Sequence, residues 1–329
     1  MTDLSVKYLG LTLRNPVIVA SSGLTNSVEK IKELENAGAG AVVLKSLFEE
    51  QILAESSHNI GKDQTYGNDV FDYVSGYIRE NSVNEYLKLI KEAKASVSIP
   101  VIASINCVDN NAWIDWAKKI EDAGADALEI NMSVLPSDSE RTSGEIEAEI
   151  FKIIEGVRKA INIPVALKMS YYSASLANFI KKISWTRNVD GIVLFNRFYN
   201  PDIDIEKFKI TSANVFSGEE SYTNSLRWVS ILCNVIDEKV DLAATTGIHS
   251  GETVIKQLLA GAKAVQTASA IYKNGHEVIT SFLKTIEDWM ERHGYETIEE
   301  FRGKMAFKAD ENTVAFERIQ FMKHFGGIE

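Results

Sequence analysis

Two short segments near the end of the chain carry residue types that suit an anion-binding site. One apolar run ends in TTG at residues 245–247, and a second ends in QTAS at residues 266–269. The residues after each segment indicate the start of a helix. Small side chains let backbone N–H groups approach a ligand closely, and helix N-termini attract negative charge. The two segments therefore predict a site for a phosphate-bearing ligand, with ordinary tight turns as the alternative.

Polar side chains follow five other apolar runs along the chain. They are Lys45 with Ser46, Asn106 with Cys107, Asn131, Lys168 and Asn196. A lysine at such a position could neutralise an electron-rich ring or a carboxylate, or form a Schiff base after losing its proton. Amides can pair with a planar heterocycle through both donor and acceptor groups. If the fold brings these positions to one rim, they predict a single ligand site.

The elements that must position these residues are short apolar runs separated by amphipathic segments. Eight runs have the continuous apolar character of strands buried on both faces, at residues 17–20, 41–44, 101–105, 127–130, 165–167, 191–195, 242–244 and 264–265. Segments with helical spacing lie between them, at residues 28–37, 85–95, 112–123, 146–161, 175–183, 224–236 and 252–260. Eight such units predict an α/β fold, a closed (β/α)8 TIM barrel, whose last two strand-to-helix loops are the usual phosphate site. An open doubly wound sheet is the alternative, but no G-x-G-x-x-G follows the first run.

The chain is predicted to form a single barrel domain over residues 1–329, with its core at about 15–295. The residues up to Asn15 partly alternate between apolar and polar, which predicts a small hairpin that closes the barrel bottom. Helical spacing from residue 281 to 292 and an extension at about 296–329 predict helical structure packed on the outside. Three long segments after predicted strands, 47–79, 132–144 and 197–223, are expected to be extended loops, either functional lids or mobile insertions.

The composition limits the class of protein. The 329 residues are 45% hydrophobic, and 35 basic against 46 acidic residues give a net charge of −11. Such a chain has no general attraction for nucleic acid or anionic membranes. No apolar run approaches the ~20 residues that span a bilayer, and the first residues lack signal-peptide features, which predicts a cytoplasmic protein. Two cysteines, and five histidines without ligand spacing, predict neither a metal site nor a disulfide framework.

Several segments, in order, resemble the dihydroorotate dehydrogenases, especially their soluble, cytoplasmic class. The matching segments are NPVIVASSG (15–23), GAGAVVLKS (38–46), DALEINMS (126–133), PVALK (164–168), SG (217–218), TTGIHSG (245–251) and GAKAVQTASA (261–270). The resemblance implies a β/α barrel that binds one FMN across the strand ends, with its phosphate in the last two strand-to-helix turns. It also implies a homodimer that oxidises dihydroorotate to orotate in pyrimidine biosynthesis by passing a hydride to FMN.

The resemblance assigns roles to individual residues of this chain. The implied FMN-binding residues are Ala20, Ser21, Lys45, Ser46, Asn131, Lys168, Phe195, Gly218, Thr246, Gly247, Ala268 and Ser269. Lys45, Asn131 and Asn196 would also contact the substrate. Lys168 would face the pyrimidine edge of the flavin, where positive charge stabilises the anionic reduced form. The last four FMN-binding residues would hold the phosphate, although the family usually has glycine at the positions of Thr246 and Ala268.

The substrate side departs further from the family pattern. The family places a catalytic Cys or Ser at the position of Val134, and a valine cannot accept a proton. Ser133 is the candidate replacement base, with Ser137 and Ser139 as alternatives. The amides that bind orotate in a second family segment are also missing, because that segment here reads YVSGY at residues 73–77.

Three functions therefore remain open. The first is an FMN-dependent oxidoreductase that acts on dihydroorotate or on another small cyclic substrate. The second is a catalytically silent flavin-binding paralogue. The third is a non-flavin barrel lyase or isomerase with a phosphorylated substrate and a Schiff-base lysine, Lys45 or Lys168. The electron acceptor is left open among fumarate, a nicotinamide reached through a partner subunit, and oxygen.

Overall fold

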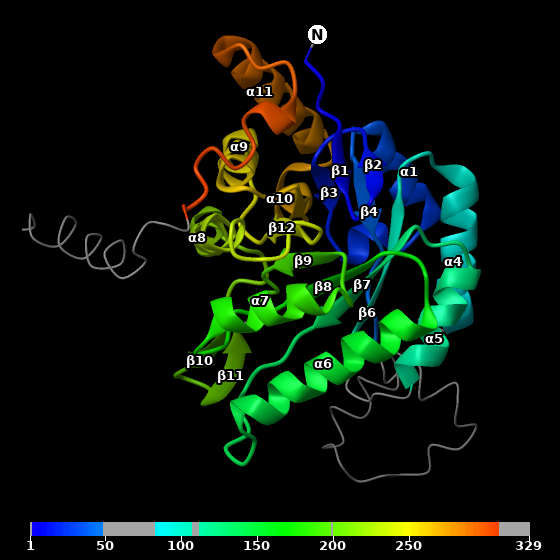
Figure 1. Ribbon diagram of the computed structural model, residues 1–329, viewed down its shortest axis with the longest axis vertical. Coiled ribbons are helices and arrows are strands. Elements are labelled where there is room, and N and C mark those ends of the chain that lie inside the picture. The colour runs from blue at the N-terminus through cyan, green and yellow to red at the C-terminus, as the bar shows by residue number, and fades with distance from the viewer. Residues whose placement is uncertain (1, 49–82, 107–111, 199, 309–329) are drawn as a thin grey trace, which may run out of the picture.

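A closed parallel barrel forms the centre of the molecule in this computed structural model, which describes residues 2–48, 83–106, 112–198 and 200–308 (Figure 1). Its strands are β3 (Val17–Val19), β4 (Ala41–Val43), β6 (Val101–Asn106), β7 (Ala127–Met132), β8 (Val165–Met169), β9 (Gly191–Leu194), β12 (Asp241–Thr245) and β13 (Ala264–Thr267). The sheet order is β4-β3-β13-β12-β9-β8-β7-β6, and a β4–β6 pairing closes it. All eight predicted strands and the TIM barrel are thus confirmed. A short ninth strand, β5 (Leu47–Phe48), extends the pairing at β6.

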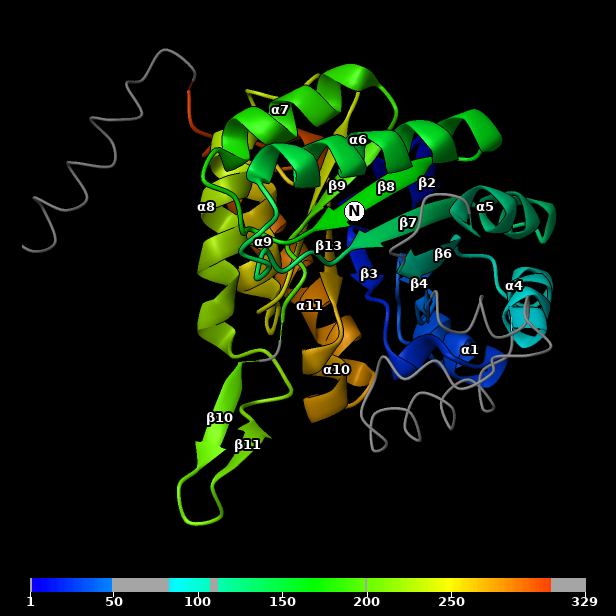
Figure 2. The same cartoon turned by 90° about the horizontal axis from the view of Figure 1, so that it is seen from below.

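Helices surround the barrel and alternate with its strands (Figures 1 and 2). They are α1 (Val28–Asn36), α4 (Val83–Ser96), α5 (Ala112–Asp122), α6 (Ser143–Ala160), α7 (Leu176–Thr186), α8 (Tyr222–Leu232), α9 (Gly251–Ala260), α10 (Ser269–Asn274) and α11 (Glu277–His293). Three short 3-10 helices are η1 (Gly23–Thr25), η2 (Glu219–Ser221) and η3 (Ile298–Glu300). Local signals set several boundaries. Thr142 and Glu145, for example, form a reciprocal capping box at the start of α6.

The predicted N-terminal hairpin is present and closes one end of the barrel. Its strands are β1 (Val6–Tyr8) and β2 (Leu11–Leu13). Leu9 and Gly10 form the turn with φ angles of 54° and 73°, which a two-residue hairpin turn requires. Leu9 is buried, and its backbone N–H donates to the carboxylate of Asp241 at 2.7 Å. The hairpin tip is therefore pinned to the start of β12.

Gly191, the first residue of β9, leaves room for this hairpin tip. A Cβ atom built on Gly191 would lie 2.5 Å from Cδ2 of Leu9. We expect Gly191→Val to lower the free energy of unfolding by about 1–3 kcal/mol, the usual cost of overpacking a core. Urea denaturation measures this change, and a variant with unchanged stability would contradict the close packing of the Leu9 side chain against Gly191.

The expectation of an extended loop at 197–223 was wrong in part, because this segment contains regular structure. β10 (Pro201–Asp204) and β11 (Lys209–Ser212) form an antiparallel hairpin that projects away from the barrel (Figure 2). At the C-terminal end, the backbone N–H groups of Met305 and Phe307 donate to the carbonyl oxygens of Leu259 and Ser230, so this part packs against the helices outside the barrel. Of the predicted helical extension, the described residues form only the short 3-10 helix η3. Residues 309–329 and most of the predicted loop 47–79 lie outside the described residues.

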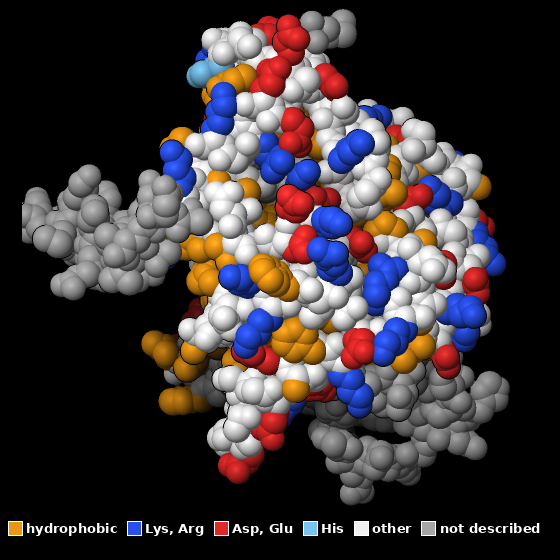
Figure 3. All heavy atoms as spheres, viewed as in Figure 1, with side chains coloured by type: hydrophobic (Ala, Val, Ile, Leu, Met, Phe, Trp, Pro, Cys, Tyr) orange, Lys and Arg blue, Asp and Glu red, His pale blue; other side chains and the backbone are white. Residues whose placement is uncertain are grey.

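The surface carries mixed charges over the face in Figure 3, where basic and acidic side chains alternate without forming a basic patch. Within the described ranges, no helix is long and apolar enough to cross a membrane.

Candidate functional site

A cavity of about 170 Å³ lies where β12 and β13 end. Its lining residues are Ala20, Arg197, Val215, Ser217, Thr245, Thr246, Gly247, Ile248, Gln266, Thr267, Ala268 and Ser269. Five of the predicted FMN-binding residues belong to this set. The cavity therefore connects Ala20 at the end of β3 and the buried Gln266 with the two turns predicted to hold a phosphate.

The turn after β12 is shaped by two consecutive residues with positive φ. Thr246 has φ 74° and Gly247 has φ 80°. A β-branched residue rarely adopts this conformation, and here the Thr246 hydroxyl donates to the carbonyl of Phe195 at 3.0 Å. The N–H of Gly247 donates to the Ser217 hydroxyl at 3.2 Å. This turn thus presents its backbone to the cavity instead of bulky side chains.

The donors around this cavity come from loops more than from helix ends. The N–H of Ser217 donates to the Ser269 hydroxyl at 3.1 Å, which joins the loop before η2 to the turn after β13. The expected helix starts are present, but α10 has only six residues, and Ser250 caps the N-terminus of α9. Because a helix of six residues has a weak dipole, hydroxyl and backbone N–H groups of the loops would supply most of the anion contacts.

Two cationic or ionisable side chains converge on the backbone of Ser217. Nε2 of His249 lies 3.0 Å from the Ser217 carbonyl oxygen, and Nζ of Lys273 donates to the same oxygen at 3.2 Å. Burial lowers the pKa of His249, and the nearby charge of Lys273 lowers it further, against smaller opposing effects that include Glu219 and Glu220. His249 is thus placed beside the candidate phosphate turn.

The lowered pKa of His249 predicts a pH dependence of stability. Below its ordinary value of about 6.5, the unfolded chain binds more protons at this residue than the folded chain does. The free energy of unfolding should therefore fall as the pH drops from 7.5 to 5, and less steeply in His249→Gln. Urea denaturation at both pH values measures the difference. An equal slope in the two proteins would contradict the assigned environment.

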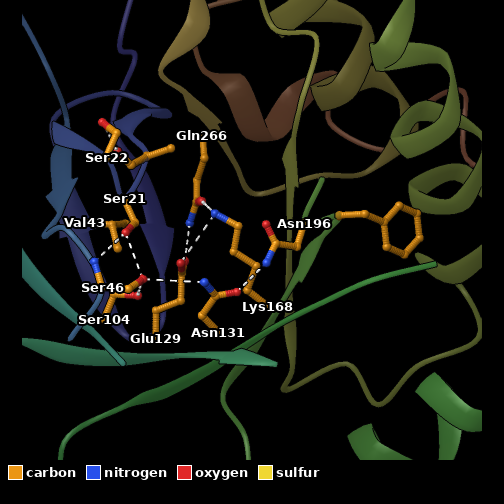
Figure 4. Close-up of polar contacts among 12 residues, drawn as sticks. Ser21, Ser22, Val43, Ser46, Ser104, Glu129, Asn131, Lys168, Asn196 and Gln266 are labelled. Atoms are coloured by element: carbon orange, nitrogen blue, oxygen red, sulfur yellow. Dashed lines mark hydrogen bonds and ion pairs between the residues drawn. The ribbon is translucent and has the colours of Figure 1, made fainter. Parts of the chain in front are cut away.

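A buried charge pair lies in the middle of the barrel (Figure 4). Nζ of Lys168 lies 3.5 Å from Oε1 of Glu129 and donates to Oε1 of Gln266 at 2.9 Å. Nε2 of Gln266 in turn donates to Oε2 of Glu129 at 2.5 Å. The three side chains come from β8, β7 and β13 and are nearly inaccessible to solvent. Sequence reasoning proposed Lys168 but missed Glu129, whose signal is a single carboxylate within an apolar strand.

A row of amides and hydroxyls crosses the same rim of the barrel (Figure 4). Asn196 donates to the amide oxygen of Asn131 at 2.6 Å, and Asn131 donates to the Ser46 hydroxyl at 3.5 Å. The Ser46 hydroxyl lies 3.0 Å from that of Ser21 and 2.8 Å from that of Ser104. The structure thus brings four predicted site residues into one network. It adds Ser104, which sequence reasoning missed because the residue lies inside a strand.

A second cavity, of about 200 Å³, lies next to the first and shares Arg197, Thr245 and Thr246 with it. Asn196, a predicted substrate residue, and Phe195, a predicted flavin neighbour, line it. Its walls include Tyr171, Phe195 and Phe198, and the ring centroids of Tyr171 and Phe195 are 5.8 Å apart. Tyr172, which lines a third cavity, lies between Tyr171 and Phe198, with centroid distances of 4.6 and 5.7 Å. The described part of the predicted substrate side is therefore aromatic as well as polar.

The residue at the usual base position lies in different surroundings. Val134 lines a third cavity, of about 310 Å³, with Ile146 and Ile150 of α6 and Phe179 of α7. Its carbonyl oxygen accepts a hydrogen bond from the Ser170 hydroxyl at 2.9 Å. The candidate base Ser133 is half-buried beside Asn131, whereas Ser137 and Ser139 are exposed. Among the described residues, no histidine or carboxylate hydrogen-bonds to Ser133.

The remaining predicted residues are placed as follows. Lys45 lies two residues beyond β4 and is half-buried. Gly218 precedes η2 and packs against its neighbour, since a Cβ atom there would lie 2.2 Å from a carboxylate oxygen of Glu220. It does not line the first cavity. Cys107 and the predicted substrate segment at 73–77 lie outside the described residues.

Comparison with known proteins agrees with this arrangement. A family model described as dihydroorotate dehydrogenase matches residues 3–290. The NAD(+)-dependent dihydroorotate dehydrogenase B catalytic subunit of Thermoplasma acidophilum is 25% identical over 305 residues, which cover 92% of this chain and 99% of that protein. The corresponding subunit of Methanocaldococcus jannaschii is 26% identical over 298 residues, 85% of this chain and 94% of that protein.

A more distant match has a different substrate name. The chloroplastic dihydropyrimidine dehydrogenase (NADP(+)) of Arabidopsis thaliana is 23% identical over 329 aligned residues, which cover 92% of this chain and 76% of that protein. The family model covers most of this chain, and the eight-stranded barrel carries the polar strand ends that suggested the resemblance. This chain belongs to the dihydroorotate dehydrogenase family and is an oxidoreductase of that family.

Proposed function

We propose that the chain is an FMN-dependent oxidoreductase that removes a hydride from a small cyclic substrate. The observation that carries this proposal is the first cavity, which runs from Gln266 beside the buried Lys168 to the turns at Gly247 and Ser269. FMN has a planar ring at one end and a phosphate at the other. Gln266, which accepts a hydrogen bond from the Lys168 ammonium, lies at the inner end of the cavity, and hydroxyl and backbone donors lie at its outer end. Groups of these kinds suit the two parts of FMN.

Different residues would bind the ring and the phosphate of FMN. When bound, FMN would accept the hydride. Lys168 would offer its positive charge at the inner end, where the reduced ring accumulates negative charge. The Ser269 hydroxyl and the N–H of Gly247 would exchange their partners around Ser217 for phosphate oxygens. The N–H of Gly247 has one long hydrogen bond to give up, at 3.2 Å, and the Ser269 hydroxyl accepts from the N–H of Ser217 at 3.1 Å, which leaves its own hydrogen free to donate.

The contacts of Lys168 disfavour it as the Schiff-base lysine of the alternative lyase. A Schiff-base lysine must reach the substrate as a neutral amine. The Lys168 side chain is instead engaged with a buried carboxylate and a buried amide inside the barrel. Trapping with borohydride in the presence of sugar phosphates should therefore leave the mass of the protein unchanged.

The substrate side favours a molecule other than dihydroorotate, although dihydroorotate is the first substrate to test. Val134 cannot accept a proton, and Asn196 is engaged on both sides, because its amide oxygen accepts from the N–H of Arg197 at 3.0 Å. The aromatic group at Tyr171, Tyr172 and Phe198 offers stacking surfaces instead. A planar ring with few hydrogen-bonding groups suits this side.

The test is the visible spectrum of the purified protein, followed by anaerobic addition of dihydroorotate. Flavin absorbance near ~450 nm that bleaches would assign dihydroorotate as the substrate. Flavin absorbance that persists would keep the oxidoreductase and require a search among other cyclic dihydro compounds. A colourless protein that fails to bind added FMN would overturn the proposal.

We expect Val134→Cys not to create dihydroorotate oxidation. The side chain at this position lines the apolar cavity between α6 and α7, so a thiol there would face Ile146 and Ile150 instead of the polar rim. The measurement is the rate of flavin bleaching by dihydroorotate in the variant and the wild type. A tenfold or greater rise would show that the missing base is the only obstacle.

We further propose that the protein acts in the cytoplasm as a homodimer. The resemblance to the soluble family members and the acidic composition support this proposal. Relatives are named for NAD(+) and, in the putative enzyme of Aeropyrum pernix, for fumarate as acceptor. Stopped-flow reoxidation of the reduced protein with fumarate, NAD(+) and oxygen would identify the acceptor used here.

A further inference from the structure

Glu129 is the most unusual residue of the barrel interior. It lies in β7 between Leu128 and Ile130, and only 1% of its surface is exposed. Placing a carboxylate in such surroundings costs several kcal/mol unless it is paired. Hydrophobic residues of similar volume would often fold at least as well. Stability alone therefore does not account for a charge at this position.

The contacts of Glu129 lead to a single functional group. One carboxylate oxygen, Oε2, accepts from the amide nitrogen of Gln266 at 2.5 Å. The other, Oε1, lies 3.5 Å from Nζ of Lys168 and accepts no hydrogen bond from the described residues. The amide oxygen of Gln266 also accepts from Nζ of Lys168 at 2.9 Å. Glu129 thus contacts the Lys168 ammonium directly and is also linked to it through Gln266.

The orientation of Gln266 reinforces this arrangement. An amide has an acceptor end and a donor end, and here the acceptor faces the ammonium while the donor faces the carboxylate. Glu129 therefore fixes the direction of the Gln266 dipole as well as the position of the lysine. Gln266 lines the first cavity, whereas Glu129 does not. Apart from the through-space effect of its charge, Glu129 can act on a ligand in that cavity only through Lys168 and Gln266.

We propose that Glu129 is a positioning residue that holds the Lys168 ammonium against Gln266 at the inner end of the cofactor cavity and thereby sets how readily a bound flavin is reduced. This inference rests on the proposed function, because it concerns the flavin that the cavity would bind. Lys168 supplies the charge, and Gln266 transmits the constraint from the carboxylate. Loss of the Glu129 charge would remove the ion-pair partner of Lys168 and the acceptor that orients Gln266, so the ammonium would no longer be fixed beside the cavity.

The direction of the expected effect separates positioning from simple charge. If Glu129 acted only through its own negative charge, its neutralisation would make reduction of the flavin easier. If Glu129 positions Lys168, then Glu129→Gln should make reduction harder, in the same direction as Lys168→Met. We expect at least a tenfold shift of the equilibrium toward oxidised flavin in each single variant. For a two-electron couple this shift corresponds to about 30 mV.

The experiment is a redox titration of FMN-loaded protein against reference dyes, followed by absorbance. The proteins are the wild type, Glu129→Gln, Lys168→Met, the double variant and Ser184→Ala. Ser184 is a buried polar residue of α7, bonded to Lys181 and Asp237, so its variant controls for general destabilisation. The double variant should match Lys168→Met, because the effect of Glu129 acts through the lysine. The control should match the wild type.

The outcomes distinguish the two proposals. A wild-type protein that binds no FMN would overturn the proposed function itself. Normal FMN binding, together with an unchanged or easier reduction in Glu129→Gln, would overturn the positioning role and leave the proposed function intact. Additive shifts in the double variant would also overturn it, since they would mean that the two residues act independently. FMN affinity, measured by fluorescence in parallel, confirms that each variant is loaded.

Discussion

Lys168→Met should lower the free energy of unfolding of the FMN-free protein by about 3–5 kcal/mol, the cost of leaving a buried charge without its partner. The lysine is the ion-pair partner of Glu129, and the pair lies inside the barrel with Gln266 as the third member. Because the three side chains are nearly inaccessible to solvent, hydration compensates little for the lost contact. Urea denaturation followed by circular dichroism measures the effect.

Two controls show whether the pairing causes this loss. The double variant Glu129→Met/Lys168→Met removes both charges, so it should recover most of the stability and retain only the cost of an unpartnered Gln266, about 1–3 kcal/mol. Lys94→Met breaks a partly exposed ion pair with Asp126 and should cost only about 0–1 kcal/mol. If Lys94→Met and Lys168→Met lowered the free energy of unfolding equally, the buried pair would contribute no more to stability than the partly exposed one.

Gly247→Ala should destabilise the protein by about 2–5 kcal/mol and abolish retention of FMN. Gly247 has φ 80°, and a Cβ atom there would lie 2.2 Å from the backbone nitrogen of Tyr222. Since the clash is with backbone, relief requires the turn after β12 to move away from the start of α8. That movement would separate the N–H of Gly247 from Ser217 and open the outer end of the cavity.

Gly124→Ala is the matched control for this variant. Gly124 follows α5 with a similar positive φ of 93°, but no atom lies within 4 Å of its built Cβ. The backbone strain alone should cost about 1–2 kcal/mol there and leave FMN retention unchanged. The difference between the two variants isolates the steric contact with α8. Equal stability losses and equal flavin content would show that the contact with Tyr222 is unimportant.

The sequence by itself determined the barrel and most of its rim. Continuous apolar runs separated by amphipathic segments favour strands buried on both faces, and the eight runs predicted all eight barrel strands. A strand that ends in a polar residue must also place it at the rim. Ser46, Asn131 and Asn196 were therefore predicted as neighbours, and the family resemblance added Ser21; the structure joins all four in one network although they are far apart in the chain.

Only the tertiary structure decided which charged and polar side chains pair inside the barrel. The sequence offers Glu129 as one charge in an apolar strand, with no signal that its partner lies 39 positions further on in Lys168 and that Gln266 bridges the two. The same holds for Ser217, whose hydroxyl and backbone join the turns after β12 and β13. Such contacts depend on distances between strands that are not neighbours in sequence. Local patterns specify which way a side chain points within its own element, but closure of the barrel decides which side chains it meets.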